Sequence, residues 1–336
     1  MHESKESAIL VVGGAGYIGS HTVRMLAGMG EKVVVLDSLV YGHEEALGVS
    51  QGVEFVLGDM ADPEVVEGIF ARFGIEAVLH FAAYCYVGES VAEPVKYYEN
   101  NLAAPLVVLA AMRRHGVGQF ILSSTCATYG DPQYVPIDEE HRQLPVNPYG
   151  WSKLMLERVL MDCGVAWGLR SVFLRYFNAS GCSLDGAIGE DHDPETHLIP
   201  LVLMAAKGER DAITVFGTDY DTPDGTCIRD YIHVEDLASA HVKGLDYLRE
   251  GGTTDWFNLG TGKGASVKEI IALAEEVTGR TVPVQVGERR PGDPSELVAK
   301  PAKAKEVLGW EAEHKNPRTM IESAWKWMSG ARGGRY

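Results

Sequence analysis

The sequence predicts an α/β fold built on a doubly wound parallel sheet, with a smaller mixed α/β lobe at its C-terminal side. Short apolar runs alternate with helical patterns through the first half of the chain, as in successive βαβ units. After about residue 178 this alternation gives way to loops rich in Gly, Asp and Pro. A chain of 336 residues is long enough for both parts, since single domains mostly span about 100 to 200 residues.

The first part of the chain supplies the predicted sheet and its covering helices. Short apolar runs are predicted as strands at residues 9–12, 32–36, 53–57, 77–81, 120–123 and 171–175. Helical patterns lie between them at residues 17–29, 63–73, 94–115 and 149–163. Asp62 followed by Pro63 is typical of a helix start, with a side-chain cap and a proline in the first turn. Pro105 interrupts the third pattern, and we therefore expect two helical pieces there.

The larger domain is predicted at residues 1–178, with later returns near 228–249, and the smaller lobe mainly at residues 179–330. Patterns assigned to the lobe are strands at 212–216 and 256–259 and helices at 266–278 and 303–308. A helical pattern at 234–249 is expected to return to the main sheet. Because chain ends commonly fray, residues 331–336 are expected to lie loose from the fold.

Composition and charge exclude several functional classes. Acidic residues outnumber basic ones by 47 to 30, and the resulting charge of −17 opposes binding to nucleic acid or anionic lipid. The polar N-terminal residues do not resemble a signal peptide, and no apolar run reaches the roughly 18 residues of a membrane span. The five cysteines show neither CxxC pairs nor the Cys/His spacing of a metal site. We therefore expect a cytoplasmic protein without a metal ion.

A glycine-rich loop follows the first predicted strand. Gly13, Gly16 and Gly19 recur at every third position of GGAGYIG, between an apolar strand and a helix. Glycines let the backbone approach a pyrophosphate closely, and the amides at a helix start donate to it. This arrangement predicts a dinucleotide site in a Rossmann-type domain. A tight strand-to-helix turn without a ligand is the alternative interpretation.

Two acidic residues bear on the identity of the nucleotide. Asp37 follows the second predicted strand, where a carboxylate accepts hydrogen bonds from both ribose hydroxyls of adenosine. That carboxylate would repel a 2′-phosphate, so the predicted cofactor is NAD rather than NADP. Asp59 follows the third strand and is a candidate to bind the adenine amino group. It is equally a candidate to stabilise a turn or to cap a helix.

A tyrosine and a lysine four residues apart form the candidate catalytic pair. Tyr149 and Lys153 lie at the start of a predicted helix and therefore share one helix face. A phenol has an ordinary pKa near 10, and a nearby ammonium stabilises its phenolate, which makes Tyr149 a candidate general base. Lys153 is also a candidate donor to the nicotinamide ribose. A surface pair on an amphipathic helix has the same spacing and is the alternative interpretation.

Hydroxyl side chains end the fifth predicted strand. Ser123, Ser124 and Thr125 lie at its carboxyl end, which in an open parallel sheet faces the ligand cleft. We expect the Thr125 hydroxyl to bridge the substrate and Tyr149. Capping of backbone groups is the alternative, and it is the expected role of at least one of the two serines.

Motifs along the whole chain point to one known family. They are GGAGYIGS at 13–20, HFAAYCYVGES at 80–90, SSTCATYG at 123–130, PYGWSK at 148–153, RYFNASG at 175–181, GTDYDTPDGTCIRDYIH at 217–233 and RRPGD at 289–293. The last three are the most specific. From residue 8 to about residue 327 the sequence resembles the UDP-glucose 4-epimerases, which are extended short-chain dehydrogenases/reductases.

The resemblance implies a reaction and a set of site residues. A hydride passes from sugar C4 to bound NAD and returns to the other face of the 4-keto sugar, while Tyr149, assisted by Thr125, moves the proton. This implies interconversion of UDP-glucose and UDP-galactose with NAD retained through turnover. The residues implied to contact the cofactor are Gly13, Gly16, Tyr17, Ile18, Gly19, Asp37, Ser38, Asp59, Met60, Phe81, Ala82, Ala83, Asn100, Ser123, Tyr149, Lys153 and Phe177. Those implied to contact the UDP-sugar are Thr125, Tyr149, Asn178, His197, Leu198, Val215, Phe216, Arg229, Arg290, Asp293 and Leu297.

The implied arginines make chemical sense on an acidic protein. The guanidinium groups of Arg229 and Arg290 offer forked donors to a pyrophosphate. A salt bridge to Asp230 or to another nearby acid is an equal alternative for either one. Asp293 is implied to accept a hydrogen bond from the uridine ribose, or else fixes the turn after Pro291-Gly292.

A few positions depart from the family pattern. Cys85 stands where lysine is common, Thr125 where serine is commoner, and His197 where asparagine is usual. Leu297 stands where a large residue excludes N-acetylated sugars and a small one admits them. Acceptance of UDP-N-acetylhexosamines therefore stays open.

Three alternatives remain beside the UDP-glucose reaction: a UDP-xylose/UDP-arabinose 4-epimerase, a UDP-N-acetylglucosamine 4-epimerase, and a non-catalytic NAD-binding protein. The last is disfavoured because Tyr149 and Lys153 are both present. A dehydratase is disfavoured because Cys126 and Ala127 follow Thr125 in place of an acid/base pair. Family members often form homodimers through the helices predicted at 94–115 and 149–163, and no nucleic-acid or membrane partner is expected.

Overall fold

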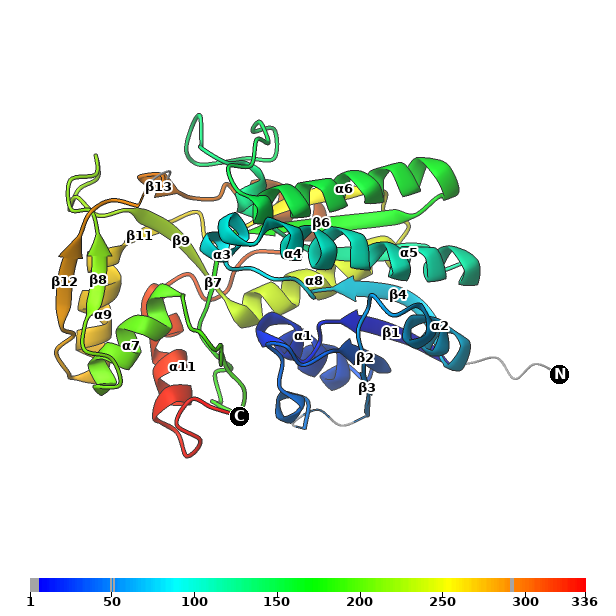
Figure 1. Cartoon of the computed structure of the whole chain (residues 1–336), viewed down its shortest axis with the longest axis horizontal. Helices are drawn as coiled ribbons and strands as arrows, with labels where there is room; N and C mark the ends of the chain where they lie inside the picture. Colours follow the sequence, from blue (N-terminus) through cyan, green and yellow to red (C-terminus); the bar gives the residue numbers. More distant parts are fainter. Residues whose placement is uncertain (1–5, 49, 51, 291–292) are drawn as a thin grey trace. The chain divides into compact units, whose positions relative to one another are not determined.

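The computed structural model describes residues 6–48, 50, 52–290 and 293–336 (Figure 1). The chain forms two compact units. Unit 1 consists of Met1–Gly130, Gln143–Arg175 and Ala238–Phe257. Unit 2 consists of Asp131–Arg142, Tyr176–Leu237 and Asn258–Tyr336. Within the described ranges, no helix combines the length and the apolar character needed to cross a membrane.

Unit 1 is built on a sheet whose centre is parallel. Its strands are β1 (Ser7–Val12), β2 (Val33–Asp37), β3 (Val53–Leu57), β4 (Gly74–His80), β5 (Gln119–Thr125), β6 (Arg170–Tyr176) and β10 (Asp255–Leu259). They lie in the order β10-β6-β5-β4-β1-β2-β3, and the pairs β1–β2, β1–β4, β2–β3 and β4–β5 are parallel. The predicted doubly wound α/β fold is confirmed. Strand order reverses between β1 and β4, and open sheets of this kind bind ligands beside that point.

Helices cover both faces of this sheet (Figure 1). They are α1 (Tyr17–Gly28), α2 (Pro63–Arg72), α3 (Val87–Ala92), α4 (Pro94–Tyr98), α5 (Ala104–His115), α6 (Pro148–Trp167) and α8 (Val234–Arg249). α2, α5 and α6 share one face, where Phe70, Val108 and Leu156 belong to a single buried core. On the opposite face, a Cβ on Gly244 of α8 would lie 3.2 Å from the side chain of Val172 in β6. The predicted return of this helix to the main sheet is therefore confirmed.

The helical segment predicted at 94–115 is divided, as Pro105 led us to expect. α4 gives way to a π-helical turn at Glu99–Ala103, and α5 then begins with Pro105 in its first turn. A π turn inside a helix often marks a functional site because it redirects the side chains that it carries. Here those side chains include Asn100 and Asn101.

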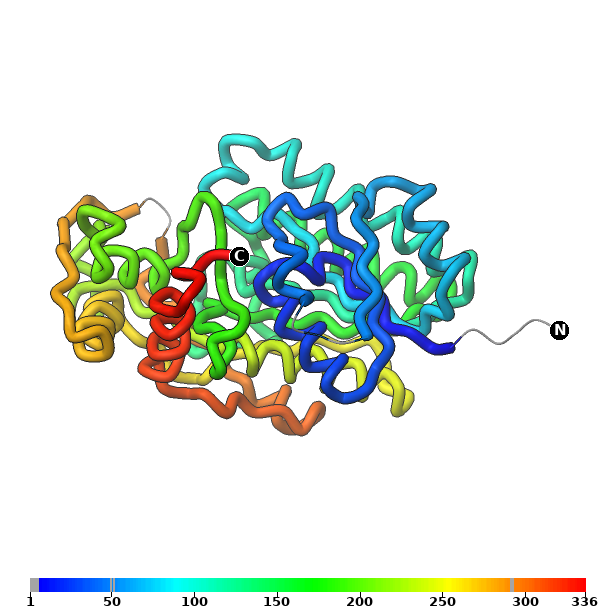
Figure 2. The backbone as a smooth tube through the Cα atoms, turned by 90° about the horizontal axis from the view of Figure 1, so that it is seen from below, coloured from blue at the N-terminus to red at the C-terminus, as the bar shows by residue number. Residues whose placement is uncertain are grey.

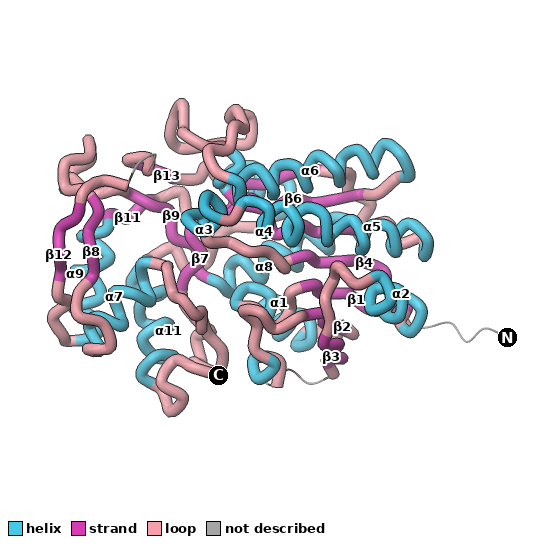
Figure 3. The backbone as a smooth tube through the Cα atoms, viewed as in Figure 1, coloured by secondary structure: helices cyan, strands magenta, loops and turns pink. Residues whose placement is uncertain are grey.

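Unit 2 consists of short strands, helices and long loops (Figure 3). Its strands are β7 (Asn178–Ser180), β8 (Ile213–Phe216), β9 (Ile228–His233), β11 (Gly264–Ser266), β12 (Val284–Gly287) and β13 (Glu296–Leu297). Its helices are α7 (Leu198–Lys207), α9 (Val267–Thr278), α10 (Ala302–Leu308) and α11 (Pro317–Ser329). β9 pairs with β11, β13 and β7, while β8 and β12 form a parallel pair. α7, α9 and α11 contribute Leu203, Ile270 and Met320 to a second buried core.

Two expectations for the C-terminal part are wrong. Residues 256–259 belong to β10, which pairs with β6 in the main sheet and not in the smaller lobe. The tail at 331–336 is packed, because the rings of Tyr336 and Trp327 lie 4.9 Å apart and the Tyr336 hydroxyl accepts from the amide of Gly189 at 2.8 Å. Figure 2 shows the red C-terminal end beside the green segment that precedes α7.

Candidate active site

The glycine loop of unit 1 brings backbone groups very close together. Gly13 has a φ of +80°, and a Cβ there would lie 2.4 Å from the amide nitrogen of Ala82. A Cβ on Gly19 would lie 2.2 Å from the carbonyl oxygen of Gly13. Only glycine tolerates these approaches, so the loop between β1 and α1 depends on both residues.

The start of α1 fits a phosphate group. Gly16 is the N-cap residue of α1 and has no side chain. The structure describes every residue of the first turn of α1, and none of them is acidic. Apart from its chain neighbours and the backbone of α1, the described part of the chain brings only the Gly13 carbonyl oxygen within 4 Å of a Cβ built on Gly16, at 3.4 Å. The amides of a helix start and the positive end of the helix dipole suit an anion at such an open position.

Asp37 is held by the backbone at the end of β2. Its carboxylate accepts from the amide of Ala15 at 2.9 Å and from the amide of Leu39 at 2.8 Å. The residue is 9% exposed, and this burial raises the pKa of its carboxyl group. The backbone amides of Ser38 and Gly16 also hydrogen-bond to this carboxylate. A carboxylate at the end of this strand is the acceptor that the ribose hydroxyls of adenosine require. The position fits NAD.

The other predicted cofactor residues differ in exposure. Met60 is buried in the core, and Asp59 accepts from the Ala61 amide at 2.8 Å, which is the turn role considered for Asp59. Ser38 is exposed, whereas Ser123 and Phe177 are buried. The remaining predicted cofactor residues outside the glycine loop and α6 are partly exposed: Tyr17, Ile18, Phe81, Ala82, Ala83 and Asn100.

The first turn of α6 lies directly against the end of β5. The Asn147 side chain caps this helix by accepting from the Gly150 amide at 2.8 Å. A Cβ on Gly150 would lie 2.6 Å from the carbonyl oxygen of Ala127, in the turn that follows Thr125. The Thr125 hydroxyl accepts from the Ala127 amide at 3.1 Å, which uses one of its acceptor sites. Tyr149, 8% exposed, is therefore held beside the strand end that carries Thr125.

Lys153 is buried one turn further along α6. Its Nζ donates to the carbonyl oxygen of Ser123 at 2.9 Å, and burial lowers its pKa to about 8. His80 at the end of β4 is fully buried, and this burial together with the charge of Lys153 lowers the pKa of the imidazole to about 3. His80 is therefore neutral near pH 7. Lys153 supplies positive charge on the helix face that also carries Tyr149.

A buried ion pair supports the same strand end. Glu157 on α6 lies 2.6 Å from Nη2 and 3.0 Å from Nε of Arg175. Glu157 also accepts from the Ser124 hydroxyl at 2.6 Å, and Arg175 donates to the Tyr129 hydroxyl at 3.1 Å. Ser124 thus has a structural role, as we expected for at least one of the two serines. Removal of either charge would leave its partner buried alone, which typically costs about 3 to 5 kcal/mol.

The π turn contributes a residue that the sequence analysis missed. Asn101 is 1% exposed, and its side chain bonds at 2.9 Å to both the amide and the carbonyl of Tyr84 and at 3.2 Å to the Ser152 hydroxyl. It also accepts from the predicted cofactor residue Asn100. Asn101 therefore ties the loop after β4 to α6. Asn101 follows the polar residues Glu99 and Asn100, so its sequence neighbours give no signal of its burial, whereas His80 stands out as a polar residue between Leu79 and Phe81.

In unit 2 the structure joins two predicted substrate residues. Arg229 on β9 donates from Nη2 to Asp293 at 2.5 Å and to the carbonyl oxygen of Pro294 at 2.8 Å. Asp230 instead accepts from the amide and the hydroxyl of Thr261, at 2.8 and 2.7 Å. The nearby acid considered for Arg229 is therefore Asp293 and not Asp230.

A second predicted arginine packs on an aromatic ring. The guanidinium carbon of Arg290 lies 4.0 Å from the centre of the Phe216 ring, which is a cation–π contact. Pro291 and Gly292, which follow in the RRPGD motif, lie outside the described residues. Val215 is 3% exposed and belongs to the second core.

The remaining predicted substrate residues lie on β7, α7 and β13. Asn178 in β7 and Leu297 in β13 are on strands that pair with β9, which carries Arg229. His197 is the N-cap residue of α7, and Leu198 is the first residue of that helix.

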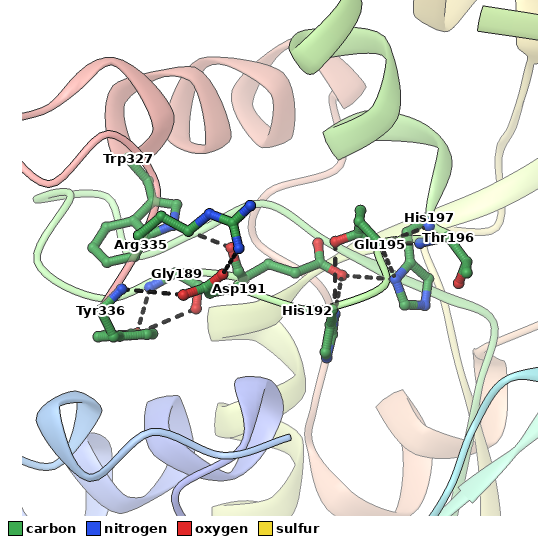
Figure 4. A network of polar contacts seen from close by, with 10 residues as sticks. Gly189, Asp191, His192, Glu195, Thr196, His197, Trp327, Arg335 and Tyr336 are labelled. Atoms are coloured by element: carbon green, nitrogen blue, oxygen red, sulfur yellow. Dashed lines mark hydrogen bonds and ion pairs between the residues drawn. The ribbon is translucent and has the colours of Figure 1, made fainter. Parts of the chain in front are cut away.

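The imidazole of His197 faces two carboxylates. Its Nδ1 lies 2.8 Å from Glu190 and 2.9 Å from Glu195 (Figure 4). Burial lowers its pKa, but the two carboxylates outweigh this effect and raise the pKa well above its ordinary value. The sequence analysis missed both acids, which lie on a loop and show no periodic pattern.

Comparisons with known proteins agree with this arrangement. The model of the NAD dependent epimerase/dehydratase family matches residues 9–260. A UDP-glucose 4-epimerase of Rhizobium meliloti (strain 1021) is 53% identical over 96% of this chain and 97% of its own length. The structure of a UDP-glucose 4-epimerase from Brucella ovis in complex with NAD has a TM-score of 0.92 and 51% identity, covering 95% of this chain and 98% of that one. A UDP-glucose 4-epimerase from Bifidobacterium longum in complex with NAD+ and UDP has a TM-score of 0.92 and 40% identity, covering 98% of this chain and 100% of that one. This chain belongs to the NAD dependent epimerase/dehydratase family.

Proposed function

We propose that this chain is an isomerase that interconverts UDP-glucose and UDP-galactose at sugar C4, with NAD as its bound cofactor. The observation that carries the proposal is the buried pair of Tyr149 and Lys153 on α6, set against the strand end that carries Thr125. The glycine loop and Asp37 in the same unit fit the dinucleotide. The relatives that carry the name UDP-glucose 4-epimerase support the choice of reaction.

The proposed catalytic residues move a proton and position the sugar. Tyr149 takes the proton of the 4-hydroxyl and later returns it, and Thr125 holds that hydroxyl against the phenol. Lys153 stabilises the phenolate by its charge and donates to the nicotinamide ribose. Bound NAD supplies the hydride acceptor and donor. Because the hydride returns to the sugar, the reaction has no net redox change and needs no second substrate.

The proposed UDP-sugar residues belong to unit 2. Arg229 and Arg290 are proposed to bind the pyrophosphate, because guanidinium groups offer forked donors to phosphate oxygens and the chain has a net charge of −17. Asp293 orients Arg229 and accepts from the uridine ribose. We accordingly assign NAD to residues 1–178 with the return near 228–249, and the UDP-sugar mainly to residues 179–330. The other residues of this proposed site are Asn178, His197, Leu198, Val215, Phe216 and Leu297.

A homodimer is also proposed, formed through α4, α5 and α6. On these helices Val95, Leu106 and Met155 are 64%, 42% and 40% exposed. We propose that a second copy of the chain covers these side chains. Sedimentation velocity of the purified chain is expected to give twice the chain mass of 36.6 kDa. Observation of a monomer at micromolar concentration would contradict the dimer and leave the reaction unaffected.

The reaction is tested with tag-free protein and no added NAD. UDP-galactose, UDP-N-acetylgalactosamine and UDP-xylose are incubated separately with the protein, and the products are resolved by anion-exchange chromatography. We expect UDP-galactose to be converted to UDP-glucose fastest. Faster conversion of UDP-N-acetylgalactosamine or UDP-xylose would mean that this nucleotide sugar, and not UDP-galactose, is the preferred substrate. Absence of any conversion by protein that carries NAD would favour the non-catalytic alternative and refute the proposal.

A further inference from the structure

Two histidines and two glutamates converge in the loop between β7 and α7 of unit 2 (Figure 4). They are Glu190, His192, Glu195 and His197, and one ligand atom from each lies within 4.8 Å of all the others. Nδ1 of His192 lies 3.2 Å from Glu190 and 3.7 Å from Glu195, and Nδ1 of His197 lies 2.8 and 2.9 Å from the same two acids. The cluster thus presents two nitrogens and two carboxylates to one point.

Hydrogen bonds alone use this geometry poorly. Each imidazole nitrogen carries at most one hydrogen, yet Nδ1 of His197 is in contact with two carboxylate oxygens at nearly equal distance. The same Glu190 oxygen also faces Nδ1 of His192. A central cation would use all these lone pairs at once, because both nitrogens and both carboxylates could bind it directly.

We propose that Glu190, His192, Glu195 and His197 bind one Zn²⁺ ion. Zn²⁺ prefers a tetrahedral set of nitrogen and oxygen ligands at about 2.0 to 2.2 Å, which places neighbouring ligand atoms about 3.3 to 3.6 Å apart. The nitrogen–oxygen separations in the cluster, 2.8 to 3.7 Å, lie around this value. Imidazole ligands favour zinc over magnesium or calcium. Two carboxylates with two neutral imidazoles also balance the charge of a divalent ion.

The cluster has the burial and the support of a built site. The side chains of Glu190, Glu195 and His192 are 4%, 9% and 11% exposed, while His197 at 38% leaves one side open for entry. Glu195 is oriented by the amides of Thr196 and His197, at 2.6 and 2.7 Å. Second contacts of this kind fix ligands in metal sites.

The C-terminal segment holds the same loop in place. The indole of Trp327 donates to the carbonyl oxygen of Glu190 at 3.1 Å, and Arg335 forms an ion pair with Asp191 at 3.2 Å (Figure 4). The Tyr336 amide also donates to Asp191 at 3.1 Å. The loop backbone is therefore fixed before any ion binds. Because His197 is the N-cap residue of α7, the ion would secure the start of that helix.

A second cluster in the same unit provides a contrast. His233, Glu235 and His314 also bring three ligand atoms within 4.8 Å. Nδ1 of His233, however, accepts from the Glu235 amide at 3.2 Å, and its Nε2 lies 3.1 Å from the Ser323 hydroxyl. Both ring nitrogens already have partners, so we assign no ion to this cluster.

The test measures Zn²⁺ binding directly. Tag-free protein is dialysed against a chelator and titrated with ZnCl₂ by calorimetry, and bound zinc is counted by mass spectrometry after gel filtration. We expect one ion per chain with micromolar or tighter affinity. His192→Asn is expected to weaken this binding at least about 100-fold, because loss of supporting contacts alone costs 10- to 100-fold. His314→Asn is the matched control and is expected to bind Zn²⁺ as the unchanged chain does.

Glu190→Gln covers the case in which His192→Asn fails to fold, since it keeps the shape of the side chain and removes its charge. We expect the same loss of affinity. Co²⁺ in place of Zn²⁺ is expected to give the intense visible absorption of a tetrahedral nitrogen and oxygen site. Absence of stoichiometric zinc, or binding that neither ligand variant weakens, would overturn the proposal and leave an ion-pair cluster with protonated imidazoles. Neither outcome depends on epimerase activity.

Discussion

The two units hold their candidate site residues in different ways. In unit 1 the backbone positions two of the proposed cofactor residues: Asp37 accepts from backbone amides that include those of Ala15 and Leu39, and Lys153 donates to the Ser123 carbonyl. In unit 2 side chains position one another, as Arg229 does with Asp293 and Arg290 with Phe216. A site fixed by the backbone changes little when one side chain is altered. A site made of paired side chains is expected to change in several places at once.

The largest effect is expected from Tyr149→Phe in unit 1. Loss of the general base should lower turnover by about 1,000- to 10,000-fold, because positioned acid–base groups contribute on this scale. NAD content should stay unchanged, since the glycine loop and Asp37 are untouched. Turnover is measured with UDP-galactose, and NAD is assayed after its release by denaturation. The matched control is Tyr134→Phe, whose phenol is on an exposed residue and pairs with Asp138. Retention of a tenth of the turnover by Tyr149→Phe would remove this residue from the mechanism.

A pH effect is expected next, at Lys153. Its folded pKa of about 8 lies below the ordinary value of 10.5, so the unfolded chain binds this proton more tightly. The buried charge therefore costs stability below pH 8, and the cost disappears as pH rises from 8 to 10.5. Lys153→Met should gain stability relative to the unchanged chain at pH 7, and this gain should shrink by about 3 kcal/mol by pH 10.5. Urea unfolding at both pH values measures the change.

Lys96→Met is the control of opposite sign. The hydrogen bond from Lys96 to Glu89, at 2.7 Å, raises the pKa of the lysine. Its contribution to stability is therefore present below the unfolded pKa of 10.5 and is lost only as pH rises through the higher folded value. Lys96→Met should lose a little stability at pH 7 and regain none by pH 10. Lys153→Met could instead gain the same unfolding free energy at pH 7 and at pH 10.5. That result would contradict the buried positive charge assigned to Lys153.

Arg229 tests the side-chain pairing of unit 2. Arg229→Ala should raise KM for UDP-galactose about 10- to 100-fold, because one charge-assisted contact to a phosphate is worth about 1.5 to 3 kcal/mol. Asp293→Ala should raise KM too. The loss of binding free energy in the double variant should be smaller than the sum of the losses in the two single variants, because each residue positions the other. Arg72→Ala, which removes an exposed ion pair to Glu54 in unit 1, should leave KM unchanged. Strict additivity at Arg229 and Asp293 would contradict mutual positioning.

The same difference explains what could be predicted from the sequence. The strands and helices of unit 1 carry local signals, such as the glycine loop and the Asp62-Pro63 start, and the structure has them close to the predicted positions. The Asn316-Pro317 start of α11 is an equally local signal, and reading it would have found that helix. α7 is harder, because an apolar run interrupted by Pro200 has no clear period.

Pairing between distant residues could not be predicted in this way. Arg229 and Asp293 are 64 positions apart, and their contact depends on how β9 and the loop before β13 fold together. The partner acid therefore stayed open between Asp230 and others. His80 and Asn101 were missed for a related reason. Their burial comes from tertiary packing, and the residues next to them in the sequence do not reveal what they contact.

The smallest effects are expected at two helix caps. Asp62 accepts from the Glu64 amide at 2.8 Å at the start of α2, and Asp62→Ala should cost about 1 kcal/mol of unfolding free energy. Ser266 caps α9 through a capping box with Glu269 and also donates to Asp224. Ser266→Ala should therefore cost more, about 2 kcal/mol, because it also removes one donor to that carboxylate, which keeps the amide and the hydroxyl of Thr226 as donors.

Conservative replacements separate the cap from the extra contact. Asp62→Asn keeps an acceptor oxygen and should restore most of the stability of α2 in thermal unfolding. In unit 2, Asp224→Ala combined with Ser266→Ala should cost less than the two single losses added together, because the hydroxyl and the carboxylate share one bond. Equal losses for Asp62→Ala and Ser266→Ala, with additive behaviour at Asp224, would mean that side chains in unit 2 are no more interdependent than those in unit 1.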